Sequence, residues 1–178
     1  MTDQELLHLA TECGFEHVGL LNMSCLEFNP AVREMCEANR CHAYGKCWTC
    51  PPGCGTLEEI SAKAAAYRRG VLVQSTGQME DDFDIETMMD TEKLQKERFL
   101  AFTDAVRERY PDCLPMAAGA CTICKECTYP DAPCRFPEKK FTSMEAYGML
   151  VLDICKANGL TYYYGPEKMA YNSLFLLK

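Results

Sequence analysis

Four cysteines lie within fourteen residues of one segment, CTICKECTYPDAPC, at positions 121 to 134. Cys121, Cys124 and Cys127 are spaced at intervals of three, and Cys134 follows after six further residues. A loop with C-x2-C-x2-C spacing can curl around a metal centre, with its backbone N–H groups directed at the sulfurs. The spacing therefore predicts a metal site held by these four thiolates.

The spacing favours an iron–sulfur cluster of the 4Fe-4S type over a zinc ion. Bacterial ferredoxin segments use the same C-x2-C-x2-C start and a later cysteine near proline. Here Pro133 and Pro137 flank Cys134. Zinc sites also use C-x2-C pairs, but zinc ribbons and fingers usually place one pair well apart from the other. Zinc is the alternative metal, and thiols without metal are a third reading.

A second group of cysteines lies in CEANRCHAYGKCWTCPPGCG, residues 36 to 55. It contains five cysteines, one more than a four-ligand cluster needs. We assign Cys36, Cys41 and Cys50 to this site, with Cys47 as the fourth ligand and Cys54 as the alternative fourth. Three ligands would leave one iron open to a small molecule, whereas four would close the cluster and suit electron transfer.

Motifs extend beyond the cysteines in both groups. The first group lies within R-x2-C-x4-C-x2-YG-x4-CPP, which begins at Arg33 and ends at Pro52. In the second group, C-R-x-P follows the cysteine triplet from Cys134 to Pro137, and SMEAYG follows at 143–148. Together these motifs resemble an uncharacterised family of cysteine-rich predicted metal-binding proteins. The resemblance covers nearly the whole chain and implies metal binding without an established reaction.

Composition limits the classes of function. With 48% hydrophobic and 25% charged residues among 178, the chain is typical of a single globular domain, residues 1–178. A net charge of -8 predicts no nucleic-acid partner, because such surfaces need clustered Lys and Arg. No apolar run approaches a membrane span. Thirteen cysteines without a signal peptide predict reduced thiols and a cytoplasmic location.

The elements that must position the cysteines follow from capping, periodicity and turn residues. We expect helices at 3–13, 57–69, 91–110 and 142–158, and strands at 15–22, 71–75, 114–119, 160–164 and 171–177. The last two strands would form a closing hairpin, and the acidic segment 80–92 would be a solvated loop. Helix, strand, cysteine segment, helix and strand thus occur twice in an α/β domain. Two pseudo-repeated halves and plain α/β alternation both account for this order.

The first hypothesis is a cytoplasmic redox module that transfers electrons between two clusters and an unknown redox partner protein or small molecule. The second is a zinc-stabilised binding protein without a redox role. The third is an enzyme that binds a small substrate at an open cluster iron. No G-x-S-x-G, P-loop or H-E-x-x-H motif is present. The sequence therefore assigns no catalytic residue and leaves the enzyme question open.

Overall fold

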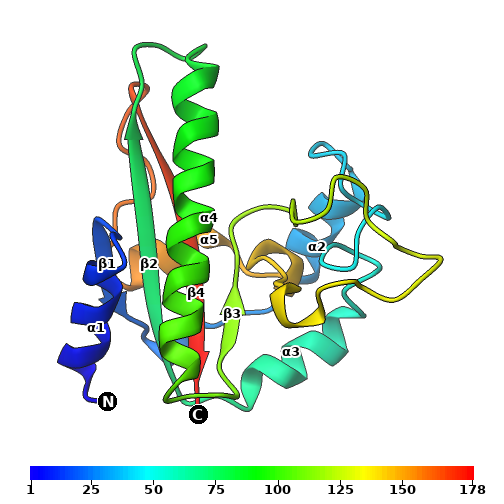
Figure 1. Cartoon of the computed structure of the whole chain (residues 1–178), viewed down its shortest axis with the longest axis horizontal. Helices are drawn as coiled ribbons and strands as arrows, with labels where there is room; N and C mark the ends of the chain where they lie inside the picture. Colours follow the sequence, from blue (N-terminus) through cyan, green and yellow to red (C-terminus); the bar gives the residue numbers. More distant parts are fainter.

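A four-stranded antiparallel sheet forms the centre of the computed structural model, which describes all residues 1–178 (Figure 1). The strand order is β1-β2-β4-β3. The two central strands pair along their full lengths, ten residues each. The strands are β1 (His17–Leu20), β2 (Arg69–Gln78), β3 (Leu114–Met116) and β4 (Lys168–Leu177).

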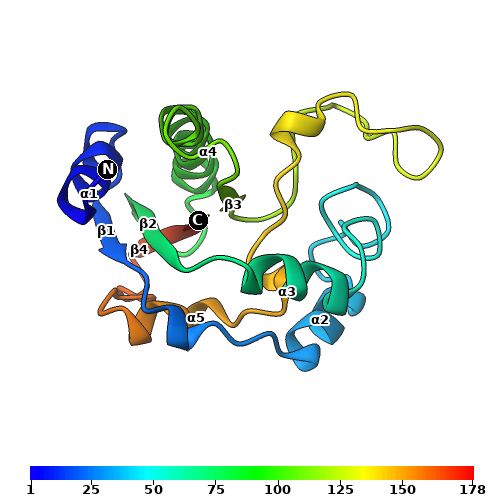
Figure 2. The same cartoon turned by 90° about the horizontal axis from the view of Figure 1, so that it is seen from below.

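Helices cover both faces of this sheet (Figure 2). Helices α1 (Asp3–Glu12) and α4 (Ile85–Arg107) pack on one face, and α3 (Leu57–Ala65) and α5 (Val151–Ala157) on the other. Successive strand residues point to opposite faces. Val71 and Val73 therefore pack with α1 and α4, whereas Leu72 packs with α3 and α5. The predicted α/β class is confirmed, as one compact domain.

Two predicted helix starts are confirmed in detail. The Thr2 hydroxyl accepts from the Glu5 N–H at 3.2 Å, and the Glu5 carboxylate accepts from the Thr2 N–H at 2.7 Å. The same reciprocal pair forms between Thr56 and Glu59, at 3.2 and 2.8 Å. Each box satisfies two backbone donors that the first helical turn leaves unpaired. These caps fix where α1 and α3 begin.

Helix α4 begins earlier than predicted. Asp84 caps it, with the carboxylate accepting from the Thr87 N–H at 3.0 Å. The expectation of a solvated loop over residues 80–92 is therefore wrong for its second part, which is helical from Ile85. A carboxylate beside the first N–H groups of a helix is favourable. An acidic stretch in a sequence can therefore indicate the start of a helix as well as a solvated loop.

The helix predicted at 142–158 is interrupted. A 3-10 turn, η3 (Glu145–Tyr147), is followed by Gly148 in the left-handed region at φ 77°, and α5 begins only at Val151. A Cβ at Gly148 would lie 2.9 Å from the Asn29 carbonyl oxygen. The chain therefore breaks the helix to pass close to another backbone segment, where only glycine fits.

The predicted closing hairpin is wrong. Residues 160–164 form no strand; β4 instead pairs with β2 along its whole length and with β3 at Leu174–Leu176. Residues 160–164 contact the buried side chain of Gln74, which donates to the Thr161 carbonyl at 2.9 Å. Tyr164 donates its hydroxyl proton to the same side chain at 2.7 Å. Buried polar groups require such partners, so this segment lies across the sheet as a loop.

The two cysteine segments extend from one side of the sheet (Figure 1). The first follows helix α2 (Pro30–Glu37), which the sequence analysis missed, and precedes α3. The second lies between β3 and α5 and contains the 3-10 turn η2 (Pro137–Lys139). Because α2 has no counterpart in the second half, the order of elements does not confirm an internal repeat. None of the helices combines the length and apolar character that a membrane crossing requires.

Candidate metal centre

Helix α2 and its Arg33 side chain hold the first cysteine segment at both ends. Asn29 caps the helix, accepting from the Ala31 N–H at 2.9 Å, and Pro30 occupies its first turn. The half-buried Arg33 guanidinium donates to the Ala146 carbonyl at 2.6 Å and also to the Gly55 carbonyl. These bonds join the start of the segment to its end and to η3.

Tight turns fold the first segment back on itself. Asn39 and His42 adopt left-handed backbone conformations, at φ 52° and 58°. The Asn39 side chain accepts from the Tyr44 N–H at 3.0 Å, which stabilises the turn locally. The Gly45 N–H donates to the Pro51 carbonyl at 2.8 Å and closes the loop. His42 is exposed, consistent with a surface position for this side chain.

Charge at neighbouring cysteines acts on the thiols of Cys36 and Cys54. Burial raises the pKa of the Cys36 thiol, the Arg33 guanidinium partly offsets this shift, and charge at Cys41 and Cys54 raises the pKa further. Burial likewise raises the pKa of Cys54, Arg33 again opposes the shift, and charge at Cys47 adds to it. A cation beside two thiols lowers the cost of forming the thiolates that bind metal.

Cys50 interacts with Cys47 within the same segment. The neighbouring Cys50 thiol lowers the pKa of Cys47, and Cys47 in turn raises the pKa of Cys50. The Thr49 hydroxyl lies 3.4 Å from the Cys47 sulfur and also lowers the pKa of Cys47. Charge at Cys41 raises the pKa of Cys50 as well, so Cys50 lies within electrostatic reach of both neighbours.

The second cysteine segment lies at the surface. No residue from 121 to 140 is buried. Its internal contacts are few: Ala132 N–H to Thr128 carbonyl at 2.9 Å, and Thr128 hydroxyl to Pro133 carbonyl at 2.9 Å. Arg135 donates to the Glu126 carbonyl at 2.8 Å. These bonds draw the ends of the loop together around its cysteines.

Three residues of the first segment attach the second segment to it. The Thr49 hydroxyl accepts from the Cys121 N–H at 3.3 Å. The Trp48 indole N–H donates to the Ala132 carbonyl at 3.1 Å, and its ring packs edge to face on Tyr129 with centroids 4.9 Å apart. A Cβ at Gly53 would meet the Tyr129 ring at 2.9 Å. The contact of Thr49 was not predicted from the sequence, where its only signal is its position among clustered cysteines.

Five cysteines line one small cavity between the segments, with a volume of about 20 Å³. Four are the predicted ligands of the second site, so the structure brings that set together. The fifth is Cys47, which was predicted as a ligand of the first site; it lines this cavity and also interacts with Cys50 of its own segment. Cys36, Cys41, Cys50 and Cys54 do not line it. The five are Cys47, Cys121, Cys124, Cys127 and Cys134.

The thiols approach one another without closing around a single point. No three His, Cys, Asp or Glu side chains form a group that could hold one metal ion in this arrangement. The donor set itself fits a thiophilic metal, because it consists of sulfur ligands alone on a loop with C-x2-C-x2-C spacing. The exposed second segment also leaves room for the loop to adjust around a bound group.

A family model described as "Predicted metal-binding protein (DUF2284)" matches residues 19–177. The match includes both cysteine segments and all four strands except the first two residues of β1. No curated protein and no solved structure matches the chain. The comparisons therefore agree with the donor chemistry at the level of metal binding.

Proposed function

The chain belongs to this family of predicted metal-binding proteins, and we propose that it is a redox protein that binds two iron–sulfur clusters through its cysteine segments. The observation that supports this proposal best is the cavity lined by five cysteines from both segments. When bound, such clusters supply one-electron transfer. The exposure of residues 121–140 supports exchange of electrons with a redox partner protein or small molecule at the surface.

The second site would be held by the four cysteines between Cys121 and Cys134. For the first site, we propose that Cys54 completes the set with Cys36, Cys41 and Cys50. Arg33 in α2 donates to the Gly55 carbonyl next to Cys54, which brings the end of the segment to the helix that carries Cys36, and charge at Cys54 raises the pKa of Cys36. Cys47, the fourth ligand expected from spacing, lines the cavity of the second segment. Its contact with the Thr49 hydroxyl would stabilise the loop beside the second site.

Zinc is the second candidate, because the cavity is small. A volume of about 20 Å³ is close to that occupied by a single water molecule. One tetrahedral zinc ion would require little rearrangement, whereas a four-iron cluster would require the second segment to move outward. Such movement is inexpensive here, since no residue from 121 to 140 contributes to the buried core. Thiolate spacing favours iron, and cavity volume favours zinc.

Metal and sulfide analysis distinguishes the two candidates. Protein purified anaerobically from a reducing cytoplasm should contain about eight iron atoms and about eight acid-labile sulfides per chain, the content of two 4Fe-4S clusters. Reduction with dithionite should produce the electron paramagnetic resonance signal of reduced clusters. Stoichiometric zinc without sulfide under these conditions would refute the redox proposal and support the zinc-stabilised binding protein.

Serine variants test the assignment of the first site. Cys54→Ser should lose about half of the iron, the share of one cluster of two, whereas Cys47→Ser should keep both clusters. Cys13→Ser, at a half-buried cysteine outside both segments, is the matched control. Loss of the first cluster in Cys47→Ser would contradict the proposed assignment. Retention of that cluster in both variants would instead support an open iron, and with it the enzyme hypothesis.

A further inference from the structure

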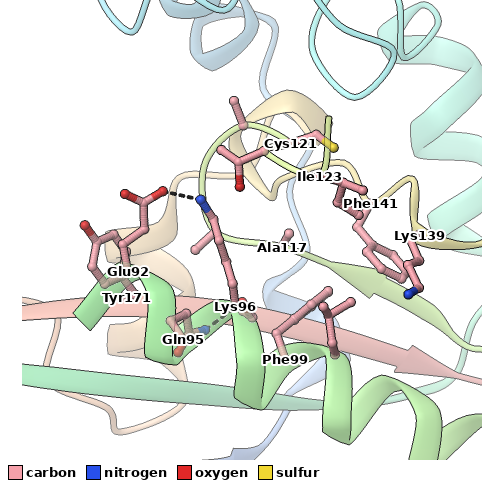
Figure 3. Close-up of a pocket in the computed structure, with 15 residues that line it drawn as sticks. Glu92, Gln95, Lys96, Phe99, Ala117, Cys121, Ile123, Lys139, Phe141 and Tyr171 are labelled. Atoms are coloured by element: carbon pink, nitrogen blue, oxygen red, sulfur yellow. Dashed lines mark hydrogen bonds and ion pairs between the residues drawn. The ribbon is translucent and has the colours of Figure 1, made fainter. Parts of the chain in front are cut away.

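A larger cavity, of about 250 Å³, lies beside the second cysteine segment (Figure 3). Its walls come from α4, from β4 and from the loop that follows β3. Nine of its fifteen lining residues are hydrophobic. The rings of Phe99 and Phe141 meet edge to face in this wall, with centroids 5.1 Å apart. An apolar cavity with aromatic walls suits a flat organic molecule.

One buried polar group in this cavity has no partner. The Gln95 side chain lines the cavity and is 1% exposed. Its amide nitrogen donates to the Ser173 hydroxyl at 2.9 Å, but its carbonyl oxygen accepts no hydrogen bond. Buried polar side-chain atoms are nearly always hydrogen-bonded. An occupant with an N–H or O–H donor would supply the missing bond.

The charged groups around the cavity favour an anion. Lys96 rises from α4 toward the loop that carries Cys121, and its ammonium group pairs with the Glu92 carboxylate (Figure 3). Lys139 also lines the cavity and forms no ion pair. Two ammonium groups against one carboxylate leave a net positive charge at the rim. A carboxylate on the occupant would balance it.

The two cavities share part of their walls. Cys121, Ile123 and Lys139 line both the 250 Å³ cavity and the small cavity of five cysteines. An occupant of the larger cavity would therefore lie next to the second cysteine site. The wall opposite the cysteine segment belongs to α4 and β4, and Phe99 and Phe141 in the cavity wall are part of the hydrophobic core.

We propose that this cavity binds a small aromatic or heteroaromatic acid whose hydrogen-bond donor meets the Gln95 carbonyl and whose acid group meets Lys139. The occupant adjoins the second cysteine segment through Cys121. Binding at this place is independent of the metal identity proposed above. The two proposals have separate measurements, so each can fail without the other.

Three related probes test the donor and the acid group separately. By isothermal titration calorimetry of the anaerobically purified protein, 6-hydroxy-2-naphthoate should bind with a dissociation constant below about 1 mM, as expected for a ligand of this size. 6-Methoxy-2-naphthoate lacks the donor and should bind about tenfold more weakly. The methyl ester of 6-hydroxy-2-naphthoate lacks the charge and should bind about threefold more weakly.

Variants of the lining residues locate the binding. Gln95→Leu should lower the affinity for 6-hydroxy-2-naphthoate to that of the methoxy compound. Lys139→Gln should weaken both naphthoates and leave the methyl ester unchanged. Lys125→Gln, a lysine of the same segment that does not line this cavity, should have no effect.

The probe comparison on the unaltered protein does not depend on the folding of any variant. Absence of binding by all three probes would overturn the proposal. Equal affinity of the hydroxy and methoxy compounds would overturn the contact with Gln95. Equal effects of Lys139→Gln and Lys125→Gln would overturn the placement of the acid group.

Discussion

The two cysteine segments carry the same chemistry in different surroundings. Residues 36–55 lie between the two helices α2 and α3, each with a side-chain cap, and contain three buried residues, Cys47, Thr49 and Pro51. Residues 121–140 contain no buried residue. Within the part that carries the cysteines, residues 121–134, a single backbone hydrogen bond forms, from the Ala132 N–H to the Thr128 carbonyl. The fold itself therefore positions the first segment. The second is held by its contacts with the first, and the proposed metal would add to them.

This difference shows how one chain can combine a cysteine segment that the fold holds in place with one that can adjust. Arg33 fixes the first segment by donating to two backbone carbonyls. One belongs to Gly55 at the end of the segment, and the other to Ala146 in η3. The second segment is held against the first by hydrogen bonds to Trp48 and Thr49 and by packing of Tyr129 and Lys140 on the Trp48 ring. Segments with few buried contacts open at low free energy, so ligand binding dominates their stability.

Metal removal should give the largest difference between the two regions. In metal-free protein, amides of residues 121–140 should exchange about 1,000-fold faster, because a ligand at about 1,000 times its dissociation constant contributes about 4.1 kcal/mol. Amides of β2 and β4 should keep their protection, since these strands pack in the sheet core. Hydrogen exchange with mass spectrometry measures both regions in one sample.

Cys124→Ser provides the same test at a single ligand, with Cys13→Ser as its control. The first should accelerate exchange in residues 121–140, and the second should not. An equal loss of protection in β2 and β4 would show that the second segment and the sheet unfold as one unit. The comparison between the two segments would then be wrong.

Arg33→Gln should give the next largest effect, on the first segment. The variant shortens the side chain and removes two charge-assisted hydrogen bonds, to Ala146 and Gly55. Each such bond contributes about 1.5–3 kcal/mol, so we expect a loss of about 3 kcal/mol in the free energy of unfolding. Urea denaturation measures this loss. Arg40→Gln, at an exposed arginine of the same segment, should change stability by less than about 0.5 kcal/mol. Equal effects of the two variants would show that Arg33 does not hold the segment.

Gly53→Ala should move the two cysteine segments apart and should lower the stability of the protein by a moderate amount. The new Cβ would lie 2.5 Å from the Cys47 carbonyl oxygen and 2.9 Å from the Tyr129 ring. This crowding should lower the free energy of unfolding by about 2 kcal/mol and should move the Tyr129 ring away from Trp48. Because Trp48 is the single tryptophan, its fluorescence reports the change directly.

Gly119→Ala is the control for this substitution. Gly119 has a left-handed φ of 69° but nothing within 4 Å of an added Cβ. The variant therefore strains the backbone without crowding the segments, and Trp48 emission should be unchanged. The same spectral shift in both variants would show that Tyr129 is not held against Trp48 by the close approach at Gly53.

Local signals in the sequence predicted part of the fold. The capping boxes at Thr2 and Thr56 are confirmed, because both partners of each box lie within four residues of one another. The pairing of β4 with β2 and β3 joins residues about a hundred and about sixty positions apart. Hydrophobic alternation gives no information about such partners. The hairpin with 160–164 was therefore wrong, although residues 171–177 were correctly predicted as a strand.

The cysteine spacing predicted which residues gather but not the direction in which each points. The four cysteines from Cys121 to Cys134 line one cavity, as their spacing suggested. Cys47 lines the same cavity from the other segment, whose loop contains left-handed turns at Asn39 and His42. Asn and His adopt this conformation more often than most residues, but their presence alone does not predict it. Helix α2 did carry one, since Asn29 and Pro30 are typical of a helix start.

The smallest expected effect is that of Trp48→Phe, which isolates one bond between the segments. Phenylalanine keeps an aromatic ring against Tyr129 but cannot donate to the Ala132 carbonyl. A neutral hydrogen bond contributes about 1 kcal/mol, so amides of residues 128–134 should exchange about fivefold faster. Tyr129→Phe is the matched control, because it removes only a hydroxyl and leaves both rings in place. If the two variants exchange equally, the indole N–H does not hold the second segment, and its position relative to the first rests on Thr49 and on metal.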